Sequence, residues 1–267
     1  MTSLFANTAG SDESSDEAPR VIPCLLLDDD RLVKTVQFAD AAYVGDPVNV
    51  LSLFNSFEVD EMILLDISAV HSRTPSDLAR LRHFAEECFI PLAYGGGVTT
   101  LLQVEQVLAA GYEKVVLNTA LAELPELVQE ASRVFGSQAI VGSIDVRGGS
   151  SGEVFVNGAT RGVGEGPVAW AKRAEALGVG EILVTAIDRE GTMSGFDLEL
   201  IEAVASVVGV PVIAHGGAGK RKDLSGPIHQ ASASAVAAGS LFVFQGPNRG
   251  VLINYPTRSQ LVRLMHR

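Results

Sequence analysis

The fold class that the sequence predicts is a (β/α)8 barrel (TIM barrel) made of two half-barrel repeats. From Arg20 onward, apolar runs of strand length alternate with stretches of helical period. The chain also repeats itself after about 120 residues, so that residues 91–97 (PLAYGGG) recur as residues 211–217 (PVIAHGG). With 267 residues, 47% of them hydrophobic, the chain suits one large barrel better than two ordinary domains. An open doubly wound sheet would not explain two matched sets of four strands.

Each expected strand is a short apolar run, and a segment of helical period follows it. In chain order, the strands are expected at residues 21–27, 61–66, 91–94, 114–118, 139–145, 181–187, 211–215 and 234–240. The helices are expected at residues 46–58, 75–88, 100–110, 124–135, 166–177, 197–207, 222–230 and 257–266. Leu78, Leu81 and Ala85 give one helix its apolar face, whereas the period of residues 222–230 is weak. These elements predict a single barrel over residues 20–267.

Residues 1–19 differ from the rest of the chain. They contain the acidic run SDESSDE at residues 11–17 and have no periodic apolar face. Such a composition is typical of a disordered acidic tail. The segment also lacks the basic region that opens a secretory signal.

Composition limits the partners that we expect. A net charge of −12 disfavours nucleic acids and anionic membrane surfaces, because both require a basic patch. No apolar run reaches the roughly 18 residues of a membrane span. Cys24 and Cys88 are isolated thiols without metal-ligand spacing. We therefore expect a cytoplasmic protein with neither a metal nor another cofactor.

Two matching glycine motifs predict phosphate binding. In (β/α)8 barrels the chemistry lies at the carboxyl ends of the strands. Residues 95–97 (GGG) follow the third strand and residues 118–119 (NT) the fourth, while residues 216–219 (GGAG) and 239–240 (GS) follow the seventh and eighth. Glycine lets backbone N–H groups approach an anion closely. Two copies at matching positions predict a ligand with a phosphate at each end.

Four carboxylates are expected at the same end of the barrel: Asp66, Asp145, Asp188 and Glu190. Asp145 closes an apolar strand, where partial burial would raise its pKa, so it is the candidate for general acid/base catalysis. The alternative is that it caps the next loop. Asp66 and Asp188 either contact a ligand or cap loops. On the repeat register Leu26 stands opposite Asp145, so the acid/base residue occurs once although the phosphate pattern occurs twice.

Two further polar residues have open roles. Lys34 falls on a hairpin after the first strand, where it is either a mobile phosphate clamp or a solvated lysine. His215 stands in the second glycine motif where Gly95 stands in the first. It is either catalytic or a loop histidine with satisfied hydrogen bonds.

Arg20, Glu61, Lys114 and Glu181 stand at the amino ends of the first, second, fourth and sixth strands. Two acids and two bases at equivalent heights could form a mutually neutralising ring at that end of the barrel. The alternative is ordinary surface charge at strand starts.

A set of motifs from Arg20 to the C-terminus carries a family resemblance. They are residues 20–25 (RVIPCL), 33–34 (VK), 45–47 (GDP), 60–61 (DE), 65–67 (LDI), 95–97 (GGG), 118–119 (NT), 144–145 (ID), 180–182 (GEI), 188–192 (DREGT) and 216–219 (GGAG). Together they resemble the cyclase (HisF) subunit family of imidazole glycerol phosphate synthase. The resemblance implies a barrel that binds a ribonucleotide with two phosphate ends. It also implies a glutaminase (HisH-like) subunit docked at the barrel bottom, whose ammonia travels through the core.

The resemblance assigns roles to residues that match the family motifs. It gives an ammonia gate to Arg20, Glu61, Lys114 and Glu181. It gives phosphate contacts to Gly97, Asn118, Thr119, Gly191, Gly217 and Ser240, and the mobile-loop lysine to Lys34.

The chain departs from the cyclases at Leu26, where the family has the first of two catalytic aspartates. Glu190 and His215 also replace the usual Asp and Ser. Residues 22–27 (IPCLLL), 43–47 (YVGDP), 94–97 (YGGG) and 237–244 (AAGSLFVF) resemble the HisF-like paralogues of lipopolysaccharide and surface-sugar clusters. In those systems the ammonia serves an ATP-dependent N-acetyl sugar amidotransferase, which makes an acetamidino sugar.

Three functions therefore stand open. The first is a HisF-like subunit that handles ammonia for acetamidino-sugar synthesis. The second is an active cyclase of histidine biosynthesis with another proton donor, and the third is a non-catalytic conduit or scaffold. Leu26 distinguishes the second function from the other two, because the family's active cyclases have a proton-transferring group at this position and a leucine cannot transfer a proton.

Overall fold

The computed structural model describes residues 19–75 and 77–265. Within these ranges eight parallel strands form the centre of the molecule. They are β1 (Arg20–Asp28), β4 (Met62–Asp66), β5 (Leu92–Gly95), β6 (Lys114–Leu117), β7 (Ile140–Arg147), β10 (Glu181–Ala186), β11 (Val212–His215) and β12 (Ala235–Ala238). The acidic tail expected over residues 1–19 lies, except for Pro19, outside the described residues.

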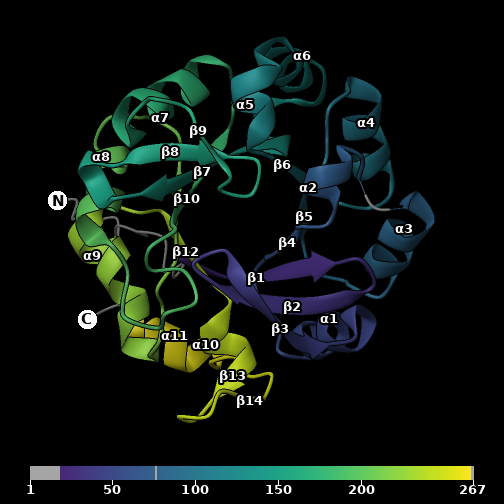
Figure 1. Ribbon diagram of the computed structural model, residues 1–267. Coiled ribbons are helices and arrows are strands. Elements are labelled where there is room, and N and C mark those ends of the chain that lie inside the picture. Colours follow the sequence, from purple (N-terminus) through teal and green to yellow (C-terminus); the bar gives the residue numbers. More distant parts are fainter. Residues whose placement is uncertain (1–18, 76, 266–267) are drawn as a thin grey trace, which may run out of the picture.

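The strands close on themselves. They pair in the order β10, β11, β12, β1, β4, β5, β6 and β7, and β7 pairs back with β10 (Figure 1). The predicted (β/α)8 barrel is therefore confirmed, and every predicted barrel strand agrees with an observed one to within about two residues.

Helices surround the barrel (Figure 1). In the described part of the chain the eight that follow barrel strands are α1 (Pro47–Ser56), α3 (Leu78–Glu86), α4 (Leu101–Ala109), α6 (Pro125–Phe135), α7 (Pro167–Ala176), α8 (Leu198–Ala205), α9 (Gly226–Ala231) and α11 (Arg258–Met265). Pro47 and Pro167 open helices α1 and α7, the equivalent helices of the two halves. The sequence repeat is thus a repeat of structure.

Short elements add to this frame, and the sequence predicted only the first hairpin. The hairpins are β2 (Arg31–Val36) with β3 (Ala39–Gly45), β8 (Glu153–Val156) with β9 (Arg161–Gly162), and β13 (Phe244–Gln245) with β14 (Gly250–Val251). The short helices are α2 (Ala69–Ser72), α5 (Thr119–Glu123), α10 (Ser240–Val243), η1 (Ser137–Ala139), η2 (Gly149–Ser151) and η3 (Arg221–Ser225). The first two hairpins extend β1 and β7 at the carboxyl end of the barrel, where they wall the site described below.

The buried apolar residues form two separate clusters. The larger cluster lies between strands and helices. The smaller one fills the barrel itself with side chains such as Ile22, Ile63, Leu183 and Ile213. Because successive side chains of a strand point to opposite faces, each strand supplies both clusters. Among the described residues no helix has the length and apolarity to cross a membrane.

Candidate active site

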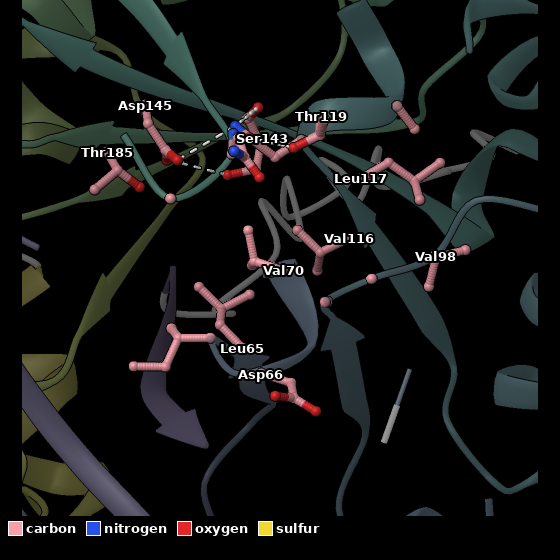
Figure 2. A pocket seen from close by; sticks show the side chains of 18 of the residues that line it. Leu65, Asp66, Val70, Val98, Val116, Leu117, Thr119, Ser143, Asp145 and Thr185 are labelled. Atoms are coloured by element: carbon pink, nitrogen blue, oxygen red, sulfur yellow. Dashed lines mark hydrogen bonds between the residues drawn. The ribbon is translucent and has the colours of Figure 1, made fainter. Parts of the chain in front are cut away.

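A cavity of about 270 Å³ opens at the carboxyl ends of the strands. Strands β1, β4, β5, β6, β7, β10 and β11 all contribute residues to its wall. Figure 2 shows Asp145, Ser143 and Thr185 gathered on one side and Leu65 and Val70 on another. The cavity lies where a (β/α)8 barrel places its chemistry.

Asp145 is the most strongly perturbed acid in this cavity. Asn118 Nδ2 donates to its Oδ2 at 3.2 Å, and Ser143 Oγ donates to its Oδ1 at 3.3 Å. Burial raises the pKa of Asp145 to about 7, although hydrogen bonds from Ser143 and Thr185 lower it; the charge of Glu190 raises it further. An acid with that pKa can give or take a proton near neutrality.

The first glycine motif forms an open cradle in the cavity wall, made by Gly97, Asn118 and Thr119. Gly97 has φ +65°, and a Cβ there would lie 2.6 Å from the Thr74 carbonyl carbon, so only glycine fits. The Thr119 hydroxyl accepts from the Asn157 backbone N–H at 3.1 Å. Asn157 belongs to the loop after β8 and was not a predicted site residue.

The second glycine motif is closed in comparison. Gly191, Gly217 and Ser240 line a separate cavity of only about 10 Å³, room for about one water molecule. Gly217 has φ +107°, and a Cβ there would lie 2.2 Å from the Gly195 carbonyl oxygen. The Ser240 hydroxyl is buried and has no hydrogen-bond partner among the described groups. The two matched motifs therefore differ in openness.

Lys34 lies against the second motif. Its side chain is 3% exposed and forms an ion pair with Glu190, itself 4% exposed. A Cβ added to Gly239 would lie 2.7 Å from Lys34 Cε, so the lysine runs directly over the second motif. The alternative of a solvated lysine is wrong, because contacts with distant parts of the chain bury the side chain. Its position in the hairpin did not by itself determine whether it would be exposed.

His215 and Glu190 lie between the two cavities and line both. His215 Nδ1 is 3.1 Å from Thr185 Oγ1, and its Nε2 is 3.7 Å from Glu190 Oε1. Burial lowers the pKa of His215 to about 4, opposed by the charge of Glu190 and assisted by that of Lys34. The imidazole is therefore neutral at physiological pH.

Asp66 and Asp188 hold loops. Asp66 accepts from Ser68 Oγ at 2.7 Å, from the Ala69 N–H at 2.9 Å and from the Tyr94 hydroxyl at 3.0 Å. Asp188 lies outside both cavities. Its Oδ2 accepts from the Gly148 N–H at 2.7 Å. Both residues therefore cap loops. Asp66 also lines the large cavity, so ligand contact stays a prediction for it.

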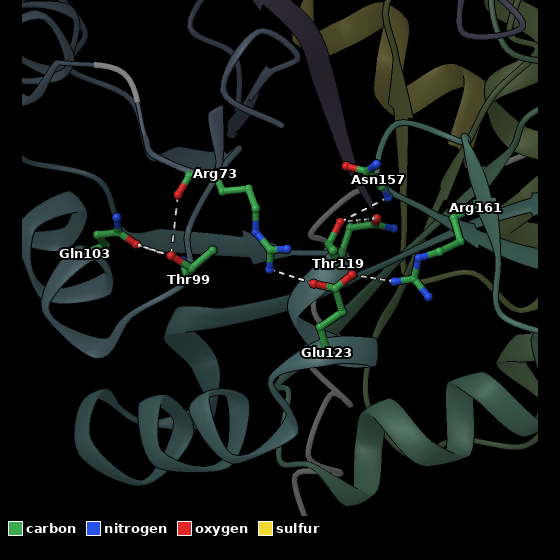
Figure 3. A network of polar contacts seen from close by, with 8 residues as sticks. Arg73, Thr99, Gln103, Thr119, Glu123, Asn157 and Arg161 are labelled. Atoms are coloured by element: carbon green, nitrogen blue, oxygen red, sulfur yellow. Dashed lines mark hydrogen bonds and ion pairs between the residues drawn. The ribbon is translucent and has the colours of Figure 1, made fainter. Parts of the chain in front are cut away.

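A charged network borders the first cradle (Figure 3). Glu123 binds Arg73 Nη2 at 2.6 Å and Arg161 Nη2 at 2.7 Å. Arg73 also lines the large cavity, so that cavity has a guanidinium in its wall. We did not predict Arg73 from the sequence. Arg73 could have been predicted, because it lies in the loop after the second strand, at the end of the barrel where the site is expected.

At the opposite end of the barrel, four charged side chains close into a ring. Lys114 Nζ contacts Glu61 Oε1 and Glu181 Oε2, each at 2.8 Å, and Arg20 pairs with the same two carboxylates. Burial lowers the pKa of Arg20, but its contacts with Glu181 and Glu61 outweigh that effect and raise it. The ring is therefore paired and hydrogen-bonded throughout, unlike ordinary surface charge.

No cluster of three or more His, Cys, Asp or Glu side chains in the described ranges is arranged to hold a metal ion.

Comparison with known proteins shows the family that this chain resembles over most of its length. Residues 20–247 match the model of the family described as histidine biosynthesis protein. A Pseudomonas aeruginosa protein provisionally named as an imidazole glycerol phosphate synthase subunit is 49% identical, covering 91% of this chain and 97% of its own. The imidazole glycerol phosphate synthase subunit HisF of Corynebacterium diphtheriae is 46% identical, over 85% and 91% of the two chains. A Leptospira interrogans protein with a provisional HisF name is 39% identical, over 93% and 99%.

Proposed function

This chain belongs to the histidine biosynthesis protein family, and from that premise we propose that it is a HisF-like synthase subunit fed with ammonia by a glutaminase. The ammonia would enter through the ring of Arg20, Glu61, Lys114 and Glu181 and cross the barrel to a phosphorylated ligand in the large cavity. The pathway we propose is acetamidino-sugar synthesis, with an ATP-dependent N-acetyl sugar amidotransferase as a further partner. The sequence features that resemble the surface-sugar paralogues support this choice.

The closed charge ring is the observation that carries the proposal. Chemistry confined to the cavity does not require two buried carboxylates and two cations at the other end of the barrel. Between the ring and the cavity the barrel is filled by apolar and small side chains, including Ala93, Ala235 and Ala237. The proposal requires neutral ammonia to pass between these side chains, because a charged ammonium ion would lose its hydration there without compensation.

The amino end of the barrel also offers a surface for the glutaminase. Phe89 is 86% exposed and Phe57 is 37% exposed, and both lie in loops that lead from a helix into a barrel strand. The Phe89 N–H donates to Asn55 Oδ1 at 3.1 Å, which ties the Phe89 loop to the last turn of α1, directly before Phe57. Exposed aromatic residues of this kind are typical anchors of protein interfaces.

A binding experiment tests the partnership. The chain should co-purify with the glutaminase encoded in its own genome, and crosslinks should lie near Glu61, Lys114 and Phe89. Phe89→Asp should weaken the complex by at least about tenfold. Leu102→Asp is the matched control, because Leu102 is 60% exposed but stands at the start of α4, at the carboxyl end of the barrel. Crosslinks confined to the carboxyl-end loops would overturn the proposal.

The second candidate is an active cyclase of histidine biosynthesis, favoured by the family match and by the pKa of Asp145 near neutrality. Leu26 opposes it, because it lines the cavity with an isobutyl group where the resemblance calls for a carboxylate. The third candidate, a non-catalytic conduit, is opposed by the buried acid/base groups that line the cavity.

A further inference from the structure

Asp145, Thr185 and His215 form a row at one height of the barrel. They lie on the adjacent strands β7, β10 and β11, and the strand register pairs Asp145 with Thr185 and Thr185 with His215. All three line the large cavity. Three polar side chains on neighbouring strands are thus presented to a single ligand space.

The other half of the barrel presents the equivalent row without polar groups. There the register pairs Leu26 with Leu65 and Leu65 with Gly95, on strands β1, β4 and β5. These three residues line the same cavity. The cavity therefore has one apolar wall and one polar wall, and the acid/base groups of this height all belong to the second half-barrel.

The hydrogen bonds of the polar row are directional. Thr185 is the register neighbour of Asp145, and its hydroxyl lowers the pKa of the Asp145 carboxyl by hydrogen bonding. The Thr185 Oγ1 lies 3.1 Å from His215 Nδ1. A threonine hydroxyl has one proton to donate. When that proton points to the carboxylate, the hydroxyl accepts from Nδ1–H, and the lone pair of the neutral imidazole is then on Nε2.

Nε2 is placed to act as a base. It lies 3.7 Å from Glu190 Oε1, which is too long for a hydrogen bond but close enough to stabilise an imidazolium. The charged or titratable groups around the imidazole are Glu190 and its partner Lys34, with Asp145 beyond Thr185. A histidine with only a structural role would have both nitrogens in hydrogen bonds.

We propose that His215 is a second acid/base group of this cavity, coupled to Asp145 through the Thr185 hydroxyl. His215 Nε2 takes a proton from one atom of the ligand while protonated Asp145 gives its proton to another, so the ligand keeps its charge. The Nδ1 proton then passes to Thr185, and the Thr185 proton passes to Asp145. The imidazole ends neutral with its proton on Nε2, and Asp145 is protonated again. Loss of the Nε2 proton to solvent and uptake of a proton at Nδ1 then restore the starting tautomer. The inference rests on the proposed function only in taking the ligand to be the one held at the first cradle.

The charge states at neutral pH support this direction. The pKa of Asp145 near 7 leaves a large fraction of the acid protonated, and the lowered pKa of His215 leaves the base unprotonated. At neutral pH Asp145 can therefore donate a proton while His215 can accept one.

The coupling can be measured without a partner or a substrate. Protein labelled with ¹⁵N-histidine and ¹³C-aspartate is titrated by NMR, with and without saturating inorganic phosphate. In the wild type we expect His215 as the Nδ1–H tautomer. We also expect His215→Gln to change the pKa of Asp145 by roughly 0.5–2, the size usual for directly coupled neighbours.

Two variants at Thr185 separate coupling from folding. Thr185→Val should abolish the effect of His215→Gln on Asp145, and Thr185→Ser should preserve it, with thermal melting as a check on the fold of each. An Nε2–H tautomer in the wild type, or an Asp145 pKa that is the same with and without His215, would overturn the inference. Because no glutaminase takes part, this outcome is independent of the outcome of the crosslinking test.

Discussion

Lys34 and Glu190 form a buried ion pair that joins the first hairpin to the loop after β10. The two residues stand 156 positions apart, and less than a twentieth of either side chain is exposed. Glu190 Oε2 has no hydrogen-bond partner among the described groups. The ion pair with Lys34 is therefore the main interaction that offsets the cost of burying the negative charge of Glu190. A buried pair of this kind is costly to break from one side only.

Lys34→Met should therefore destabilise the fold by about 3–5 kcal/mol, because it leaves a buried carboxylate without its cation. The double variant Lys34→Met/Glu190→Leu should recover most of that loss. Urea unfolding of the two single variants and the double variant gives the coupling free energy. Equal stability of Lys34→Met and the wild type would show that the pair is open in solution.

Asp145 should make stability depend on pH. Its folded pKa of about 7 lies above its ordinary value of 3.8, so the folded protein binds the extra proton between these values. This contribution is fully present below the unfolded pKa and is lost as the pH rises through the folded one. A rise of this size corresponds to on the order of 4 kcal/mol.

Asp145→Asn should remove this dependence. The unfolding free energy of the variant minus that of the wild type should grow from pH 4.5 to pH 8, as measured by urea unfolding at several pH values. His215 titrates in the same range and is coupled to Asp145 in our proposal, so the comparison is repeated with Asp145→Asn in a His215→Gln background. If the difference in unfolding free energy between the variant and the wild type does not change with pH, the raised pKa of Asp145 is contradicted.

The barrel could be predicted from the sequence because its strands are continuous apolar runs and its two halves repeat. The charge ring could be proposed for a similar reason. Arg20, Lys114 and Glu181 open strands, Glu61 directly precedes one, and strand starts lie at one height. Position alone left ordinary surface charge as the alternative. The position of a residue along a strand therefore predicts its place in the structure wherever the regular geometry of the barrel sets its height.

The closed second cradle could not be predicted in this way. Gly217 and Ser240 repeat the pattern of Gly97 and Thr119, but the contact that distinguishes them is the burial of Lys34 over Gly239. That contact depends on the path of a hairpin with register shifts between β2 and β3. Periodicity carries no information about such a path.

Phosphate should bind first at the cradle of Gly97, Asn118 and Thr119, which opens to the large cavity. Binding at Gly217 and Ser240 requires Lys34 to exchange Glu190 for the anion. Glu190→Gln removes the competing carboxylate and should tighten phosphate binding at the second cradle by roughly tenfold, the value of one charge-assisted hydrogen bond. Crystals soaked in phosphate locate the anions, and calorimetry measures both affinities.

Thr119→Val is the matched control for this experiment, because it should weaken only the first cradle. Anions in both cradles of the wild type would support a ligand with two phosphate ends. Occupancy of the first cradle alone would reduce the ligand to a monophosphate and would count most strongly against the cyclase alternative.

Leu26 provides the sharpest test of that alternative. Loss of one acid/base group commonly costs a factor of roughly 10²–10⁴ in rate. Given the cyclase ribonucleotide and ammonium salts, the wild-type chain should turn over at or near background. His215 does not compensate, because it lies in the same half-barrel as Asp145 and not on the wall where position 26 faces the ligand.

Leu26→Asp should then restore cyclisation, by at least about a hundredfold over Leu26→Asn, which has a similar shape and no acid. Both substitutions put a polar group at a site that is only 8% exposed, so thermal melting must show that the two variants fold equally well. Wild-type turnover at the rate of an ordinary cyclase would refute the prediction. In that case Glu190, His215 or a bound water would supply the proton that Leu26 cannot.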